Sequence, residues 1–146
     1  LPGDRLTIGA CDNAMEYDQN NFGNQIASCD ALIWTFRNNP AVMKNPKMYG
    51  WVEVDQSGQA IKVSCKAPIS EQPLKDHAVV GTFSFKRADI FIRCVKSMVA
   101  KDRRINNEFY MDVALDECIQ LGNVVLPLEV KKYICWGTPS DLEING

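Results

Sequence analysis

No segment of this 146-residue sequence approaches the roughly 20 consecutive apolar residues that a membrane-spanning helix needs. Neither sign of charge is in clear excess, because 16 basic residues stand against 18 acidic ones and the formal net charge is −2. The amino-terminal residues lack the basic leader and long apolar stretch of a signal peptide. These absences argue against a membrane protein and against a protein that binds nucleic acid through a basic surface.

Closely spaced cysteine pairs are also missing. The six cysteines are scattered, without any C-x-x-C motif: Cys11, Cys29, Cys65, Cys94, Cys118 and Cys135. A chain of this length buries a sufficient core without disulfides. We therefore expect six free thiols in a cytoplasmic protein, and the spacing argues against a zinc site.

A glycine-rich phosphate loop is a third absence, since neither G-x-G-x-x-G nor G-x-x-x-x-G-K-[ST] occurs. A doubly wound nucleotide-binding sheet normally opens with such a loop. Either the fold does not bind nucleotides, or its front half lies outside these residues.

Strands and helices alternate along the chain. Strand patterns cover residues 6–11, 31–36, 77–85 and 123–130, a hairpin covers 49–64, and helical periodicity covers 22–28, 88–102 and 108–122. Residues 31–36 are continuously apolar, as in a strand buried on both faces. Ser140 is the expected cap of a last short helix, after a turn that includes residues 133–138. The pattern predicts one α/β domain over residues 1–146, with a mixed, mainly parallel sheet that carries an antiparallel hairpin.

The stretch "TIGACDNAM" ends an apolar strand at Cys11 and continues with Asp12 and Asn13. Asp and Asn favour turns, because their side chains hydrogen-bond the local backbone. A carboxylate at the carboxyl end of a strand is also well placed to bind a metal ion. This stretch by itself does not distinguish the two interpretations.

Five motifs in collinear order resemble the sugar nucleotidyltransferases, the pyrophosphorylases that make NDP-sugars. They are "IGACDN", "YGWVEVDQSGQAIKVSCKAP", "DHAVVGTFSFKR", "NNEFYMDVALDECIQLG" and "WGTPSDL", and they run from about Thr7 to Leu142. The resemblance implies part of a Rossmann-like nucleotidyltransferase sheet of the GT-A-like kind. Because the family's amino-terminal glycine-rich loop is absent, it also implies that the chain is the C-terminal portion of the domain.

The chemistry that this resemblance implies is nucleotidyl transfer from a nucleoside triphosphate to a sugar 1-phosphate, with Mg²⁺ as cofactor and pyrophosphate as leaving group. Asp12 then becomes a catalytic metal ligand and Asn13 helps to shape the same turn. Lys66 matches the lysine of the family's E-K-P motif, which contacts the sugar phosphate; otherwise it is a solvated loop residue. Cys65 replaces the glutamate of that motif, which leaves the choice of sugar open.

Further substrate-binding residues follow from the same resemblance. Gly50 and Gly81 match glycines that let the backbone approach the sugar, although a bulge or hairpin would also explain them. Glu108 and Asp112 are four residues apart and are expected on one helix face near the cleft, although a preference for acidic residues at helix starts explains them nearly as well.

The last motif departs from the family's W-L-D-x-G-T pattern. Tyr133 stands at the Trp position, as an aromatic wall for sugar or base, and Cys135 stands at the position of the second metal-binding Asp. A thiol is a poor Mg²⁺ ligand. Either Asp141 or another carboxylate substitutes, or one carboxylate suffices. Trp136 is expected in the core, and the single histidine, His77, is expected to pack or to hydrogen-bond the backbone.

Two other functional classes stay open. One is a non-catalytic sugar-phosphate-binding or assembly domain of the same fold, and the other is an α/β scaffold without a small-molecule site. The expected partners are a nucleoside triphosphate and a sugar 1-phosphate, without nucleic acid or membrane. Self-association through an exposed sheet edge is expected as well.

Overall fold

The computed structural model describes residues 1–146. The strands are β1 (Leu6–Ile8), β2 (Asn13–Glu16), β3 (Ala31–Phe36), β4 (Gly50–Val54), β5 (Ala60–Cys65), β6 (His77–Phe85), β7 (Val125–Glu129) and β8 (Lys132–Cys135). The helices are α1 (Gln19–Ser28), α2 (Ala88–Ala100), α3 (Met111–Gln120) and α4 (Pro139–Asn145), with two short 3-10 helices at Pro40–Met43 and Pro46–Met48. No helix is both long enough and apolar enough to cross a bilayer.

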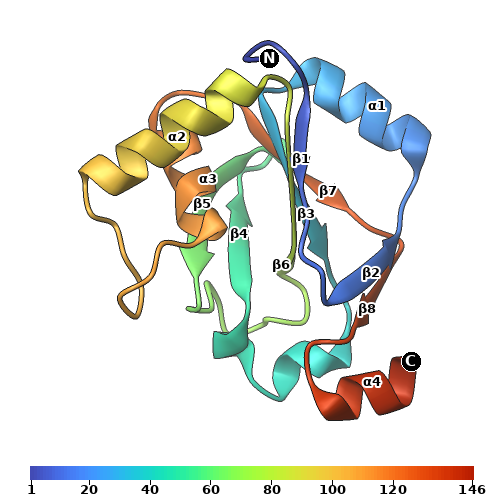
Figure 1. The fold of residues 1–146 in the computed structure, drawn as a ribbon. Coiled ribbons are helices and arrows are strands. Elements are labelled where there is room, and N and C mark those ends of the chain that lie inside the picture. Colours follow the sequence, from blue (N-terminus) through green and yellow to red (C-terminus); the bar gives the residue numbers. More distant parts are fainter.

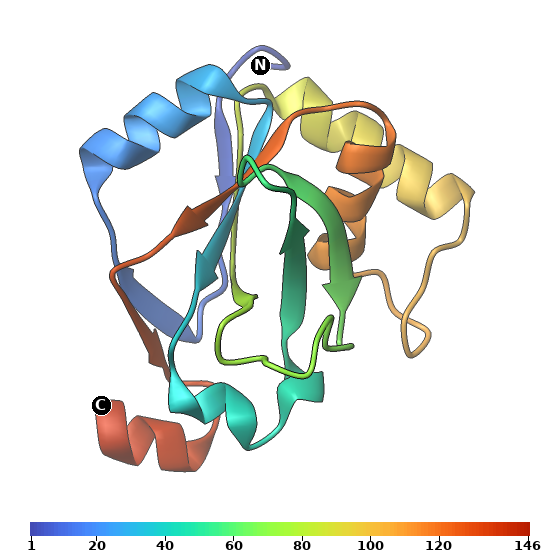
Figure 2. The same cartoon turned by 180° about the vertical axis from the view of Figure 1, so that it is seen from behind.

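A central sheet separates α2 and α3 on one side from α1 on the other (Figures 1 and 2). Alternate residues of β3 point to opposite faces: Ala31 and Ile33 pack with α2 and α3, whereas Leu32 and Trp34 pack with Ile26 of α1. All six residues of β3 are buried, which confirms the prediction of a strand covered on both faces. The mixed α/β architecture is confirmed with it.

The sheet is mainly antiparallel, so the prediction of a mainly parallel sheet was wrong. Its strand order is β5-β4-β6-β3-β7, and β1 pairs with β6 as well. The long strand β6 runs antiparallel to β1, β3 and β4, and only β3 and β7 form a parallel pair. Alternation of strands and helices along a sequence does not reveal strand direction, and here one central reversed strand sets the orientation of most pairs.

A second, two-stranded sheet of β2 and β8 was not predicted from the sequence. Its antiparallel register places Asn13 opposite Cys135. The strand expected over residues 6–11 ends at Ile8, and the polar residues after it form β2 instead. The last helix is capped by Thr138, which accepts the Asp141 N–H at 3.2 Å, rather than by Ser140.

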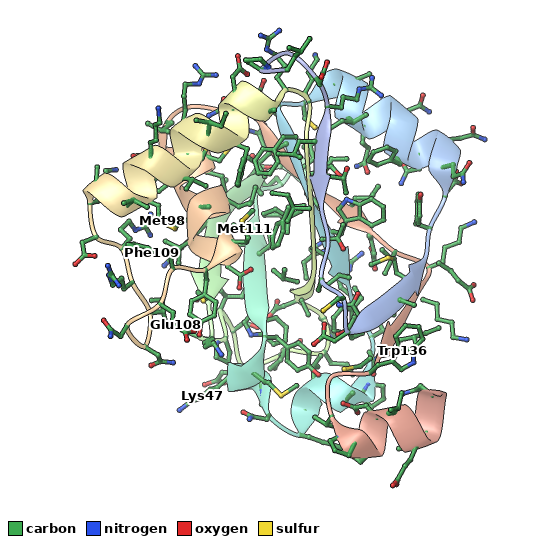
Figure 3. The ribbon with its side chains drawn as sticks, viewed as in Figure 1. Lys47, Met98, Glu108, Phe109, Met111 and Trp136 are labelled. Atoms are coloured by element: carbon green, nitrogen blue, oxygen red, sulfur yellow. The ribbon has the colours of Figure 1, made fainter.

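The sequence predicted that His77 packs or hydrogen-bonds the backbone and that Trp136 lies in the core, and the structure treats the two residues differently. His77 lies at the start of β6 and its Nδ1 is 2.8 Å from Thr35 Oγ1, so it packs within the sheet and bonds a side chain rather than the backbone. Trp136 is 37% exposed and its indole N–H donates to the Asn145 carbonyl, so the core assignment was wrong (Figure 3). The tight turn after β8 carries the ring outward.

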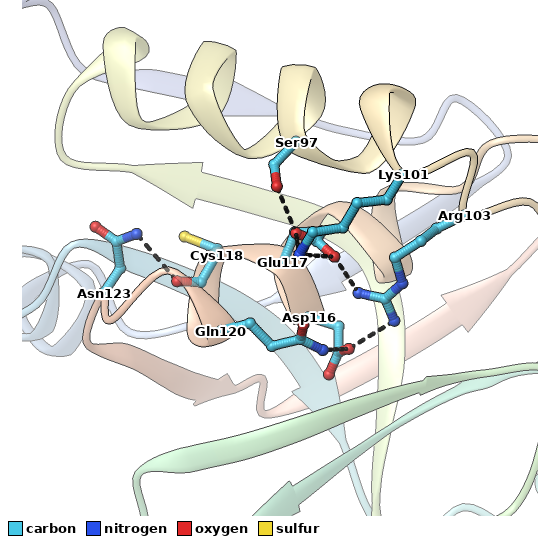
Figure 4. A network of polar contacts seen from close by, with 8 residues as sticks. All are labelled: Ser97, Lys101, Arg103, Asp116, Glu117, Cys118, Gln120 and Asn123. Carbon is cyan, nitrogen blue, oxygen red and sulfur yellow. Dashed lines mark hydrogen bonds and ion pairs between the residues drawn. The ribbon is translucent and has the colours of Figure 1, made fainter.

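Helix α3 is held in place by buried charges (Figure 4). Arg103 donates to Glu117 at 2.6 Å and to Asp116 at 2.8 Å, and Asp116 also accepts the Val63 N–H of β5 at 3.0 Å. Burial alone would raise the pKa of Glu117, but hydrogen bonds from Ser97, Arg103 and Lys101 together outweigh it and lower that pKa to about 2. The network fixes α3 against β5 and α2.

Candidate functional site

The largest cavity, about 490 Å³, opens beside the sheet between the end of β1, the start of β4 and the turn after β8. Six residues singled out from the sequence line it: Asp12, Asn13, Gly50, Gly81, Asp112 and Tyr133. They come from segments that are far apart in the sequence, and the fold brings them together. A smaller cavity of about 340 Å³, lined by Arg37, Lys131 and Lys132, gathers only Tyr133 from this set.

Asp12 lies at one end of the cavity, in the turn between β1 and β2. Its carbonyl accepts the Trp136 N–H at 2.8 Å, which ties it to the turn after β8. A Cβ on Gly137 would lie 3.3 Å from Asp12 Oδ2 and 3.5 Å from Cys135 Sγ. The Asp12 carboxylate and the Cys135 thiol therefore both approach the backbone at Gly137.

Asn13 connects this turn to the middle of β6. Its Nδ2 donates to the Val80 carbonyl at 2.9 Å, whereas its Oδ1 is buried and has no hydrogen-bond partner. Gly81 has a φ of +103°, which disfavours other residues, and a Cβ there would lie 3.3 Å from the Ala10 side chain. The close approach at Gly81 is made by the residues before Asp12, and it holds the Asp12 turn against β6; the predicted approach to a sugar stays a prediction.

Gly50 provides a second close approach, at the opposite end of the cavity. A Cβ at this position would overlap the carboxylate of Asp112, which reaches over from the first turn of α3. Burial raises the pKa of Asp112 to about 6, although the Cys65 thiol and the Lys66 ammonium both act to lower it. Gly50 and Asp112 therefore form one feature of the site.

Lys66 and Glu108 do not line the cavity, but both contact a tyrosine that does. Lys66 Nζ lies 5.1 Å from the centre of the Tyr110 ring, and the Tyr110 hydroxyl donates to Glu108 Oε2 at 2.7 Å. Helix α3 begins at Met111, so Glu108 precedes it, and the expectation that Glu108 and Asp112 share a helix face was wrong. Figure 3 shows Glu108 in the loop before α3.

Three tyrosines line the cavity. Tyr133 stacks on Phe36 with ring centres 4.2 Å apart, and burial together with Cys135 raises the pKa of its hydroxyl well above the usual range. Tyr49 and Tyr110 were missed in the sequence. Each stands next to a residue that was identified, Gly50 or the first turn of α3, but a single tyrosine in an apolar context gives no signal of its own.

The donors near Asp12 fit a metal ion that arrives with phosphates better than a resident one. No three His, Cys, Asp or Glu side chains converge anywhere in the chain. Asp141 Oδ2 lies 3.4 Å from Cys135 Sγ and accepts the Thr138 hydroxyl at 2.7 Å, so this carboxylate sits directly behind the thiol. Mg²⁺ is commonly held by one or two carboxylates, waters and substrate phosphates, and Asp12 satisfies the minimum.

No protein-family model and no curated protein sequence matches this chain. Solved structures do match. The nucleoside-diphosphate-sugar pyrophosphorylase from Vibrio cholerae RC9 has a TM-score of 0.75 at 16% identity, over 96% of this chain and 55% of that one. The inositol-1-phosphate CTP transferase from T. maritima has a TM-score of 0.63 at 10% identity, over 97% and 52% of the two chains. HddC from Yersinia pseudotuberculosis has a TM-score of 0.61 at 14% identity, over 97% and 54%.

The chain has the nucleotidyltransferase fold. It spans about half the length of the solved structures that it matches. The fold that the collinear motifs indicated is therefore confirmed, whereas identities of 10–16% say nothing of substrates.

Proposed function

We propose that this chain carries the metal and acceptor side of a nucleotidyl-transfer site, which joins a sugar 1-phosphate to a nucleoside triphosphate and releases pyrophosphate. The observation that supports this most is the single cavity that gathers Asp12, Asn13, Gly50, Gly81 and Tyr133 from distant segments of a nucleotidyltransferase fold. The residues selected by motif resemblance and the residues selected by geometry are largely the same.

The reaction needs positioning and charge neutralisation more than proton transfer. Lys66, at the rim beside Tyr110, is the cation that would meet the acceptor's phosphate as a point charge. The absent side chain of Gly50 leaves room for the Asp112 carboxylate and that of Gly81 leaves room for Ala10, so both glycines shape the cavity that Tyr133 also lines. A magnesium ion held by Asp12 would neutralise the phosphates as they come together.

We further propose that residues 1–146 form the C-terminal portion of a nucleotidyltransferase domain. The chain covers about 55% of the matched pyrophosphorylase, and none of its residues forms a glycine-rich phosphate loop. The triphosphate would then be held by backbone N–H groups outside these residues. The six unpaired thiols support a cytoplasmic location.

The test is pyrophosphate release by the gene product that contains these residues, supplied with magnesium, each nucleoside triphosphate and a set of sugar 1-phosphates. Asp12→Asn should lower kcat by about a hundredfold or more and change KM little, because it removes charge neutralisation in the transition state. Asp18→Asn is the matched control, since Asp18 only caps α1 and Asn caps equally well. Full activity of the Asp12→Asn variant would refute the assignment.

A non-catalytic acceptor-binding domain is the second candidate. It is favoured by the thiol of Cys135, which stands where a second metal-binding carboxylate is expected and lies close to Asp12. Binding of a sugar 1-phosphate without turnover in the complete gene product, under every triphosphate supplied, would establish this alternative.

A further inference from the structure

The Asp112 carboxylate is a group whose position ordinary packing does not explain. It lines the cavity from the first turn of α3, and its hydrogen-bond partner is the side chain of Cys65. Its neighbours are the Cys65 thiol, which faces it, and the Lys66 ammonium. A desolvated carboxylate with so few donors costs stability, and such groups occur most often where a ligand supplies the missing donors.

The backbone around this carboxylate is shaped to receive it. Any side chain at Gly50 would overlap Asp112, and Val79 would lie only 3.1 Å from a Cβ there. Gly50 begins β4 within a buried segment and is not needed for a turn, because its φ is not in the left-handed region. The glycine therefore provides the space that allows a helix-borne carboxylate to reach the cavity.

The surroundings fit hydroxyl groups as the missing donors. Tyr49, Tyr110 and Tyr133 line the same cavity as Asp112. Acceptor oxygens next to aromatic faces suit a hydroxylated ring, which presents C–H groups on its faces and O–H donors at its edge. Cys65 is small and cannot accept strong hydrogen bonds in place of Asp112.

We propose that Asp112 is a specificity-determining residue, which accepts hydrogen bonds from ring hydroxyls of a cyclic polyol phosphate and so selects the acceptor. According to the sequence resemblance, the carboxylate that binds sugar hydroxyls belongs at position 65, where this chain has a cysteine. In this proposal, Asp112 of α3 provides that carboxylate instead. The inference rests on the proposed function for the site, and it adds which residue recognises the hydroxyls.

The direct test is the titration of the Asp112 carboxyl carbon by NMR in the 146-residue chain. The probes are α-D-glucose 1-phosphate, α-D-mannose 1-phosphate and myo-inositol 1-phosphate, with inorganic phosphate as the control. Hydroxyl donors stabilise the charged carboxylate, so a bound polyol phosphate should lower the pKa of Asp112 by about one unit. Inorganic phosphate brings negative charge without such donors and should leave this pKa unchanged or raise it.

Matched variants test the same point by affinity. D112N should weaken polyol-phosphate binding about tenfold, the loss expected for a charge-assisted hydrogen bond, and leave phosphate binding unchanged. G50A keeps the carboxylate but displaces it, so it should cause a similar loss, and the D112N/G50A double variant should be no worse than either single one. C65D combined with D112N should restore part of the affinity.

The possible outcomes separate this proposal from the proposed function. A polyol phosphate that binds without lowering the pKa of Asp112, and that binds D112N as tightly as the unaltered chain, overturns the role of Asp112 and leaves nucleotidyl transfer standing. Failure of all three polyol phosphates to bind would overturn the role of Asp112, whereas the proposed function fails only if the gene product that contains these residues releases no pyrophosphate. The titration uses the unaltered chain, so it decides the matter even if a variant does not fold.

Discussion

Asp112 illustrates how a carboxylate that is removed from water lowers the stability of the fold at neutral pH. Its pKa is about 6 in the folded chain, against 3.8 for an unperturbed aspartate, because burial disfavours the charge. A carboxyl whose pKa is raised by folding contributes stability at low pH, and this contribution is lost as the pH rises through the folded value. The stability difference therefore develops between about pH 4 and pH 6.

Replacing Asp112 with Asn should for that reason stabilise the chain at neutral pH. We expect a gain of about 1–2 kcal/mol in the free energy of unfolding at pH 8, reduced from the full linkage value because the side chain is only partly buried. The gain should largely disappear at pH 4. Urea denaturation of both forms at the two pH values measures it, and a gain of equal size at both would contradict the assigned pKa.

The six thiols should differ sharply in reactivity. All six are free: Cys11 is exposed, Cys65 and Cys135 are half-buried, and Cys29, Cys94 and Cys118 are buried. Under native conditions a thiol reagent should modify Cys11 rapidly and the buried three only on unfolding. Burial raises the pKa of Cys65 to about 11, so it should react more slowly than Cys11.

In denaturant without reductant, the same titration should count six thiols. A count of four or fewer would mean that disulfides form, which would also remove the support for a cytoplasmic location.

At the residue scale, a site residue can be recognised from the sequence when its chemistry is unusual for its position. Asp12 after an apolar strand and Gly50 before one both carry such a signal, and the structure places both in the cavity. Tyr49, Gly137 and Thr138 carry none, because an aromatic next to a strand, or a Gly-Thr pair in a turn, is common in any fold. Gly137 and Thr138 line the cavity because β8 pairs with β2, and Tyr49 lines it because it directly precedes β4.

At the element scale, the anchoring of α3 decides the shape of the site. Helix α3 carries Asp112 at its start, and the carboxylates of Asp116 and Glu117, one turn further along, are 5% and 0% exposed. The guanidinium of Arg103 contacts both carboxylates. Removing one partner of a buried ion pair leaves an uncompensated charge, which is far more costly than losing an exposed pair.

Arg103→Met should accordingly lower the free energy of unfolding by about 3–5 kcal/mol. Arg104→Met is the matched control from the same loop, because Arg104 pairs with the exposed Asp102 at 2.6 Å and should cost at most about 1 kcal/mol. Denaturation midpoints of the two variants measure the difference. Equal losses would show that the network in Figure 4 does not hold α3.

The bounds of strands and helices were predicted correctly where the local sequence pattern matches the way the segment packs in the fold. The strand at 77–85 and the strand at 31–36 have the bounds that their apolar runs indicated, and Gly122, with a φ of +88°, follows the end of α3 as expected. Strands β2 and β8 are four residues each, and neither shows the alternation of apolar and polar residues that marks a half-buried strand. Each is stabilised by pairing with the other across the length of the chain, so no local pattern could have revealed them.

On the scale of the whole molecule, we expect the 146-residue chain alone to have no nucleotidyltransferase activity. A triphosphate needs fixed N–H donors around its phosphates, and none of these residues forms the glycine-rich loop that supplies them. Incubation with magnesium, each triphosphate and several sugar 1-phosphates should release no pyrophosphate. Release at about 1 per second, a rate typical of enzymes, would show that the nucleotide site has been misplaced.

The same chain should self-associate through β1. This strand pairs only with β6, so its second edge offers unpaired backbone groups, and no helix packs along it in Figure 1. A charged side chain on an edge strand opposes such pairing, so Thr7→Lys should shift the chain toward monomer. Ile61→Lys, at an exposed position of β5, another edge strand of the same sheet, is the matched control and should leave the equilibrium unchanged.

Sedimentation velocity over a range of concentrations gives the monomer fraction of each form. A chain that stays monomeric at the highest concentration would contradict the prediction. An equal response to both substitutions would place the contact elsewhere than on β1. Loss of association only with Thr7→Lys would identify the β1 edge as the surface where a further strand adds to this sheet, and that is where we expect the remainder of a complete nucleotidyltransferase domain to join it.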